Sequence, residues 1–168
     1  MSNSEQDKSE LAAQYDKLAD EVLKLYLAGR ERSRAALEAA MDKASAQMTA
    51  LGEFSAEQGQ EFRRYLSRDL EQTVADAQKL GDEAKDKLHP ARLGAGALAS
   101  LASVLEFTSQ ALHSLSDRTK QALTYKTGEI TTAGTLTCQA CGQQVHLKHT
   151  GHVPPCPKCS GTVFSKGY

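Results

Sequence analysis

Residues 138–161 read CQACGQQVHLKHTGHVPPCPKCSG, and this stretch holds all four cysteines of the 168-residue chain. The cysteines form two Cys-x-x-Cys pairs, Cys138 with Cys141 and Cys156 with Cys159, separated by 14 residues. Two residues between paired cysteines allow a tight turn that aims both sulfurs at one ion, and two such turns complete a tetrahedral thiolate site. The spacing therefore predicts one structural Zn²⁺ bound by these four side chains.

Other uses of these cysteines are also open. Iron accepts four thiolates from two Cys-x-x-Cys pairs, so the alternative function is a rubredoxin-like iron electron carrier. A further interpretation is that the cysteines form disulfides or a redox-active pair. The reducing cytoplasm would disfavour this, because it keeps cysteines as thiols. His146, His149 and His152 lie between the pairs and could replace a thiolate or bind a second metal. With four thiolates available, we interpret them as surface histidines.

Short β-prone segments at residues 135–137, 145–147 and 162–164 flank the cysteine pairs, as in a zinc ribbon. Gly142 follows the first pair, where a left-handed residue helps the amides turn toward the sulfurs. Ser160 holds the equivalent place after the second pair, so we expect that turn to be slightly irregular. The whole predicted ribbon, residues 125–168, has almost no apolar core, and we expect it not to fold without metal.

The rest of the chain has the composition of a helical protein. Hydrophobic residues make up 40% of the chain, aromatic residues 5%, and Trp is absent, which favours Ala- and Leu-rich helices. Apolar residues recur at helical spacing in two registers, which predicts one long helix with a change of face near residues 29–34. The two stripes are Leu11, Tyr15, Leu18, Val22 and Leu25, then Leu37, Met41, Ala44, Met48 and Leu51.

A helical hairpin follows from the next signals. Gly52 ends the first helix, and Ser55 with Gln58 forms a capping box that opens a second. The second helix should end at Pro90. Its stripe is Phe62, Leu66, Leu70, Val74, Ala77, Ala84 and Leu88. So short a turn predicts an antiparallel hairpin in which opposite residues have numbers that sum to about 105.

The hairpin brings opposite charges together. The expected neighbours are Glu38 and Asp42 beside Arg63, Arg64 and Arg68, and Arg34 beside Glu71. We therefore interpret the arginine clusters as paired surface charge rather than as a nucleic-acid-binding stripe. The formal net charge of −1 also excludes a generally basic, histone-like binder.

A third helix is predicted over residues 92–124. Its heptad positions are Leu98, Leu101, Leu105, Leu112 and Leu115. This helix either closes a coiled-coil-like bundle with the hairpin or pairs with a second copy of the chain through residues 93–115. Its uncharged part, residues 93–105, is shorter than the roughly 20 residues of a membrane span. Beyond it the composition changes to Gly, Thr and Pro, which divides the chain into a helical domain, 1–124, and a ribbon domain, 125–168.

Two stretches resemble one family. GEFSAEQGQEFRRYLSRDLEQ at residues 52–72 and GEITTAGTLTCQACG at residues 128–142, with the later CPKC and Phe164, resemble the bacterial YbeL-like zinc-ribbon family. The resemblance implies a helical N-terminal region with a C-terminal ribbon, and it implies the four cysteines as zinc ligands. It supplies no reaction, substrate or partner. The expected fold is thus mainly α, a long antiparallel hairpin plus a third helix, followed by a small β zinc ribbon.

The sequence favours a binding protein over an enzyme. His89 and His113, the histidines of the predicted helices, lack the Glu three residues earlier that a di-iron bundle needs, and phosphate-binding and hydrolase motifs are absent. Four Lys and one Glu in residues 125–168, with four thiolates and one Zn²⁺, leave a net charge of about +1, a weak footprint for phosphate. We therefore expect a non-catalytic adaptor with a protein partner, nucleic acid being a weaker possibility. The polar, acidic start MSNSEQDKSE favours the cytoplasm.

Overall fold

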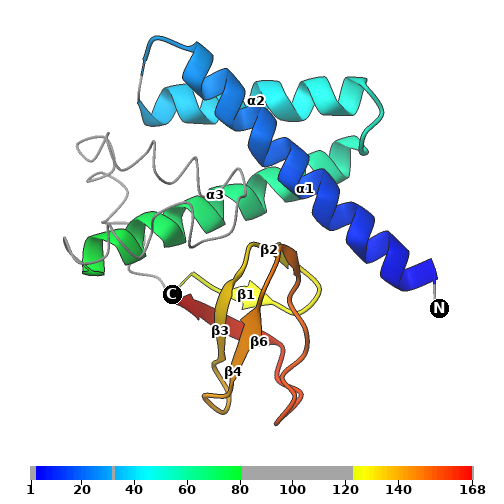
Figure 1. The fold of residues 1–168 in the computed structure, drawn as a ribbon, viewed down its shortest axis with the longest axis vertical. Helices are drawn as coiled ribbons and strands as arrows, with labels where there is room; N and C mark the ends of the chain where they lie inside the picture. The colour runs from blue at the N-terminus through cyan, green and yellow to red at the C-terminus, as the bar shows by residue number, and fades with distance from the viewer. Residues whose placement is uncertain (1–2, 32, 81–122, 168) are drawn as a thin grey trace.

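The structure, a computed structural model, describes residues 3–31, 33–80 and 123–167 (Figure 1). Three helices come first in these residues: α1 (Asn3–Ala28), α2 (Arg34–Ala50) and α3 (Ala56–Leu80). Six short strands follow: β1 (Tyr125–Lys126), β2 (Ile130–Thr131), β3 (Gly134–Cys138), β4 (Gln144–Leu147), β5 (Gly151–His152) and β6 (Val163–Gly167). This order of helices and then a small antiparallel β region confirms the predicted fold class.

The single long helix predicted over residues 11–51 is wrong, because the chain turns between α1 and α2. Ser33 lies in the extended region with φ −121° and ψ 164°, and its Oγ accepts a hydrogen bond from the Ala36 amide at 3.1 Å. A serine N-cap satisfies an amide that the start of a helix leaves without an intrahelical acceptor. Two helices, one ending near Gly29 and the next capped by Ser33, are thus more favourable than one continuous helix that contains Gly29 and changes its apolar face there.

The hairpin of α2 and α3 is confirmed in detail. Leu51 caps α2, and Gly52 takes a φ of 75°, in the left-handed region that favours glycine. The capping box forms as predicted: the Gln58 amide donates to Ser55 Oγ at 3.2 Å, and the Ser55 amide donates to Gln58 Oε1 at 2.9 Å. The ion pair between Arg63 and Asp42, with an N–O distance of 2.6 Å, lies at the predicted register.

One core joins the three helices, and α1 crosses the hairpin to cover it (Figure 1). Its largest members from the predicted stripes are Tyr15, Leu18, Val22, Leu37, Met41, Met48, Phe62, Leu66 and Leu70. Leu51 is the exception among the predicted core residues, since it is 79% exposed at the end of α2. The remaining residues of the α3 stripe lie outside the described side chains.

The ribbon consists of two small antiparallel sheets. The larger has the order β1-β6-β3-β4, and the smaller pairs β2 with β5. The three predicted β-prone segments fall in β3, β4 and β6, with Leu136 opposite Val145 on one side and Lys166 on the other. Tyr125, Leu136, Val153 and Phe164 pack in its core together with two cysteines, Cys138 and Cys156.

The ribbon packs against the helices rather than standing apart from them. β5 contacts α1, and both β2 and β6 contact α3, so that the ribbon lies beneath these two helices in the view of Figure 1. Ile130 of β2 is 3% exposed and belongs to the helical core.

Several predictions fall outside the described residues. These are the end of the second helix at Pro90, most of the third helix over 92–124, and the self-association surface at 93–115. Residues 123 and 124 are described and are not helical. The division into domains between residues 124 and 125 stays a prediction. Within the described ranges, no helix is both long and apolar enough to span a membrane.

Candidate metal centre

The four cysteines predicted as ligands come together. Their Sγ atoms all lie within 4.8 Å of one another, with Cys138 and Cys159 at 3.6 Å and Cys141 and Cys156 at 3.6 Å. Four sulfurs bound tetrahedrally to zinc at about 2.3 Å lie about 3.8 Å apart. The cluster therefore has the donor atoms and the dimensions of a tetrathiolate metal site.

Two turns with the same pattern of backbone hydrogen bonds hold the sulfurs. In the first, the Cys138 amide donates to Gln143 O at 2.8 Å, and the Gly142 amide donates to Cys138 O at 2.9 Å. In the second, the Cys156 amide donates to Gly161 O at 3.0 Å, and the Ser160 amide donates to Cys156 O at 2.9 Å. The chain thus builds the same turn twice, 18 residues apart.

The expected irregularity of the second turn is wrong. Ser160 takes a φ of 57°, close to the 71° of Gly142 in the first turn. Among the described residues it is the only one other than glycine with a positive φ. A left-handed conformation costs a residue with a Cβ about 1–2 kcal/mol. The second turn therefore keeps the geometry of the first, with strain at Ser160.

The residue after Ser160 shows how closely the backbone approaches the sulfurs. A Cβ added to Gly161 would lie 3.0 Å from Cys138 Sγ and 3.1 Å from Cys159 Sγ. Both distances are shorter than an ordinary contact, and sulfurs fixed on an ion could not move away. The sulfur cluster therefore favours glycine at residue 161, since a Cβ there would require a sulfur to shift by a few tenths of an ångström, whereas the backbone dihedrals of Gly161 do not demand it.

The cysteines differ in exposure and in acidity. Cys138 and Cys156 are buried, Cys141 is half-buried and Cys159 is exposed. Burial raises the pKa of Cys156, but hydrogen bonds from the amides of Cys159 and Lys158 outweigh it and lower this pKa to about 6. The Cys159 pKa is raised to about 12, first by the hydrogen bond of its thiol with Cys141. Four thiolates this close require a cation to ionise together, which is what a divalent metal supplies.

The histidines of the ribbon do not join this cluster in the described residues. His146 and His149 are exposed, and His146 Nδ1 lies 2.9 Å from Thr135 Oγ1. His152 is half-buried in β5 near α1, where burial and then the charge of Lys8 lower its pKa. The interpretation as surface histidines therefore fits His146 and His149, whereas His152 is half-buried.

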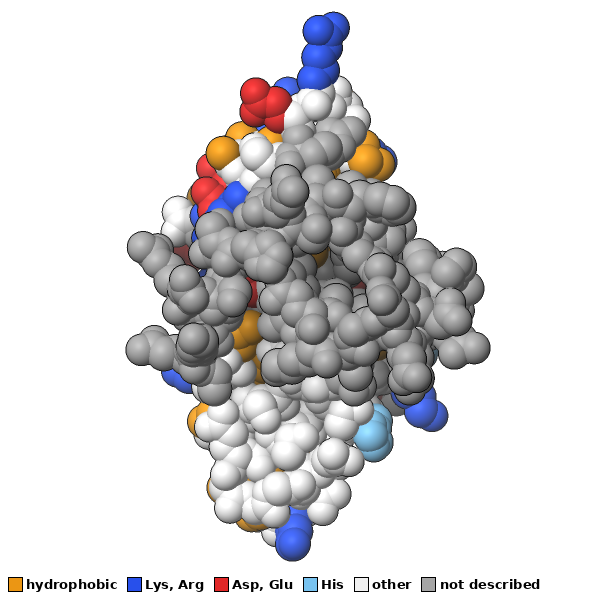
Figure 2. All heavy atoms as spheres, turned by 90° about the vertical axis from the view of Figure 1, so that its left-hand side faces the viewer, with side chains coloured by type: hydrophobic (Ala, Val, Ile, Leu, Met, Phe, Trp, Pro, Cys, Tyr) orange, Lys and Arg blue, Asp and Glu red, His pale blue; other side chains and the backbone are white. Residues whose placement is uncertain are grey.

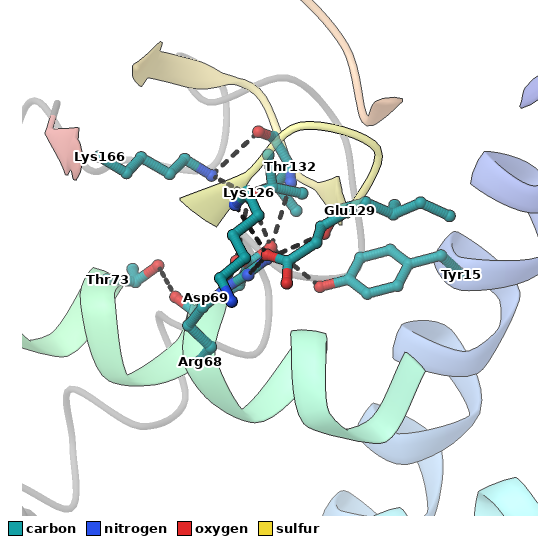
Figure 3. Close-up of polar contacts among 10 residues, drawn as sticks. Tyr15, Arg68, Asp69, Thr73, Lys126, Glu129, Thr132 and Lys166 are labelled. Atoms are coloured by element: carbon teal, nitrogen blue, oxygen red, sulfur yellow. Dashed lines mark hydrogen bonds and ion pairs between the residues drawn. The ribbon is translucent and has the colours of Figure 1, made fainter. Parts of the chain in front are cut away.

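Sequence reasoning missed a polar cluster between the helices and the ribbon (Figure 3). Arg68 of α3 was predicted to pair with Glu38 or Asp42, and this is wrong. Its guanidinium instead forms an ion pair with Glu129, donates to Ile130 O at 3.0 Å, and lies 3.9 Å from the Tyr125 ring centroid. Arg68 thus faces the ribbon, because β1 supplies the aromatic ring of Tyr125 and the segment after it supplies the Glu129 carboxylate.

Asp69 is the centre of this cluster and is 1% exposed. Its carboxylate accepts hydrogen bonds from Tyr15 OH at 3.0 Å, Thr131 Oγ1 at 3.0 Å and the Thr132 amide at 3.1 Å. Thr131 Oγ1 in turn accepts from Lys166 Nζ at 2.9 Å. Burial and then the charge of Asp69 raise the pKa of Tyr15 well above its usual value, so its hydroxyl remains a donor.

The other predicted charge pairs are partly realised. Arg34 forms an ion pair with Glu38 at 2.8 Å within α2, rather than across the hairpin. Arg34 is also near Glu71, as predicted. Burial raises the pKa of the Glu71 carboxyl, and the nearby charge of Arg34 opposes this rise. Arg64 lies 5.2 Å from the Tyr65 ring centroid.

Comparison with known proteins shows which family the chain matches. A family model described as "Zinc-ribbon containing domain" (DUF1451) matches residues 26–167, which is most of the chain. Neither the curated proteins nor the solved structures that were searched gave a match.

Proposed function

The chain belongs to the family of zinc-ribbon containing domains, and from this premise we propose that it is a non-catalytic zinc-binding adaptor. The observation that carries the proposal is the set of four cysteine Sγ atoms within 4.8 Å of one another. When bound, the metal would cross-link the two turns of the ribbon. Residues 52–72 and 128–142 further support a YbeL-like member of this family.

A structural zinc fits this donor set. Cys138, Cys141, Cys156 and Cys159 would fill all four positions of a tetrahedral ion, which leaves none for a substrate or a reactive water. That closed set supports a role without catalysis. The rubredoxin-like iron carrier remains the second candidate, favoured by the exposure of Cys159, which brings one ligand to the surface.

The charge of the ribbon supports a protein partner over nucleic acid. One of its four lysines, Lys166, is 6% exposed and points toward Thr131 and Thr132, so its charge is unavailable to phosphate. On the face that Figure 2 shows, the ribbon end at the bottom of the view presents mostly uncharged atoms, with isolated Lys and His side chains. We propose that the partner contacts this surface together with the helices, in the cytoplasm, where reduced thiols retain the metal.

Metal analysis tests the site. The purified full-length chain should contain one zinc per chain and be colourless, whereas an iron tetrathiolate would be red. The Cys138→Ser, Cys141→Ser double variant should lose the metal. Full zinc content in that variant would contradict the assignment, and stoichiometric iron in protein from its own cells would favour the second candidate.

Binding measurements test the partner class. The full-length zinc-loaded chain should show no saturable binding to duplex or single-stranded nucleic acid at physiological salt, because its local charge is low. A protein partner recovered from its own cells should stay bound after nuclease treatment and should bind the purified chain directly. Tight, salt-dependent binding to nucleic acid would contradict the proposal.

A further inference from the structure

We propose that the metal site is coupled to the helices through Asp69, so that metal release detaches the ribbon and uncovers the face that α1 and α3 present to it. The residues that carry this coupling are Arg68 and Asp69 on α3 with Glu129, Thr131, Thr132 and Lys166 on the ribbon, together called the Asp69 latch (Figure 3). The proposal does not depend on the adaptor role.

The ribbon side of the latch needs the metal to fold. Two of the six buried residues in the described ribbon core are the ligands Cys138 and Cys156. Without a metal, these sulfurs repel as thiolates or remain as thiols around an unfilled centre. Besides the cysteines, only four fully buried apolar side chains remain in this core, with three more partly buried around them: Leu123, Val145 and Leu147. That is a small core for six short strands, so the apo ribbon should lose its fold.

Backbone connections tie the latch to the cysteines. The Val153 amide donates to Glu129 O at 2.8 Å, and Val153 lies three residues before Cys156. Thr132 lies two residues before β3, which ends at Cys138, and Lys166 lies opposite Leu136 in the paired strand β6. Each ribbon residue of the latch is therefore in place only while the strands beside the cysteines are in place.

The helical side of the latch would lose its partners with the ribbon. Asp69 would lose the donors Thr131 and Thr132, and Arg68 would lose Glu129. Ile130 would leave the helical core. A carboxylate that keeps its burial without its donors is strongly unfavourable, so this part of α1 and α3 should open to water. Because linkage is reciprocal, the same contacts should raise the affinity for metal.

The first test measures zinc affinity of the full-length chain by competition with a chromophoric chelator. Asp69→Asn removes the charge of the latch while keeping the side-chain size. Asp42→Asn is the matched control, because Asp42 is a carboxylate of the same hairpin that pairs with Arg63 on the exposed side. We expect Asp69→Asn to weaken zinc binding about tenfold, within the usual range of such couplings, and Asp42→Asn to leave it unchanged. Equal affinities of the two variants would overturn the proposal.

The second test needs no variant and decides the matter if Asp69→Asn does not fold. Amide hydrogen exchange is compared between the zinc-loaded and the chelator-treated wild-type chain. Zinc removal should increase exchange in residues 15–22 of α1 and 62–70 of α3, but not at the α2–α3 turn around Gly52. These two segments hold Asp16, Arg68 and Asp69, which form hydrogen bonds with the ribbon. Increased exchange confined to residues 125–167 would overturn the coupling.

Discussion

Ser160 and Gly142 occupy equivalent places in the two metal-binding turns, with φ values of 57° and 71°. Glycine adopts this conformation without steric cost, whereas serine is strained by about 1–2 kcal/mol. The pair therefore allows one conformational effect to be measured in both directions within one protein.

Replacing Ser160 by Gly should stabilise the zinc-loaded ribbon, and replacing Gly142 by Ala should destabilise it. Backbone strain at these positions costs a residue with a Cβ about 1–2 kcal/mol. Glycine costs only about 0.4–1 kcal/mol, because it gives the unfolded chain more conformational entropy. Each substitution should therefore change the free energy of unfolding by about 1 kcal/mol net. Thermal unfolding followed at the ribbon, with zinc in excess, measures both changes. A loss of stability in Ser160→Gly would show that the serine side chain contributes more than its backbone strain removes.

At the residue scale, the sequence predicted the four cysteines that cluster but not the latch. Cys138, Cys141, Cys156 and Cys159 are recognisable because tetrahedral coordination demands a local spacing. Asp69 has no such signal, since an aspartate beside Arg68 on a mixed-charge helix looks the same whether it is solvated or buried. Its role depends on Thr131, which is 62 residues away in the sequence.

At the scale of elements, Gly59 decides how closely α3 approaches α2. An added Cβ would lie 2.7 Å from Ser45 Oγ and 2.9 Å from Phe54 Cε2. Alanine is more favourable than glycine in a helix by about 1 kcal/mol, but overpacking of this kind costs about 1–3 kcal/mol. The contact should therefore outweigh the gain in helix propensity.

Gly59→Ala should lower the free energy of unfolding of the helices by about 1 kcal/mol. Urea denaturation followed by circular dichroism at the helix signal measures it. Lys43→Ala, an exposed change on α2, is the control and should have little effect. A stabilised Gly59→Ala chain would mean that Ser45 and Phe54 move aside easily, and that the close approach is not required.

The element boundaries were predicted where a local signal fixes them. Ser55 and Gln58 formed the capping box, and Arg63 met Asp42 because the short turn sets the register. The break between α1 and α2 was missed, because Ser33 was not recognised as an N-cap. The strands β1, β2 and β5 have two residues each, too few for a periodic pattern to be seen.

At the scale of the whole molecule, the ribbon is fixed to the helices by one apolar side chain as well as by the latch. Ile130 comes from β2 but lies in the core formed by α1, α2 and α3. The contact of Ile130 with the helices forms only in the tertiary structure, and its sequence neighbours have the composition of a loop, GEITTAG at residues 128–134. The sequence therefore gave no reason to join it to the helices.

Ile130→Ala should destabilise the helices as well as the ribbon, by about 2–5 kcal/mol for a buried isoleucine. Val145→Ala is the matched control, because Val145 packs in the ribbon on the edge strand β4. Urea unfolding monitored at the helix signal should show a lower midpoint for Ile130→Ala only. An unchanged midpoint would mean that the helices do not depend on this contact.

The central claim is that one metal ion is bound by four cysteine sulfurs. X-ray absorption at the zinc edge of the full-length protein tests it most directly, because the first shell reports the number and the type of ligand atoms. We predict four sulfurs at about 2.3 Å and no nitrogen. A first shell that contained histidine nitrogen at about 2.0–2.1 Å, or fewer than four sulfurs, would contradict the account.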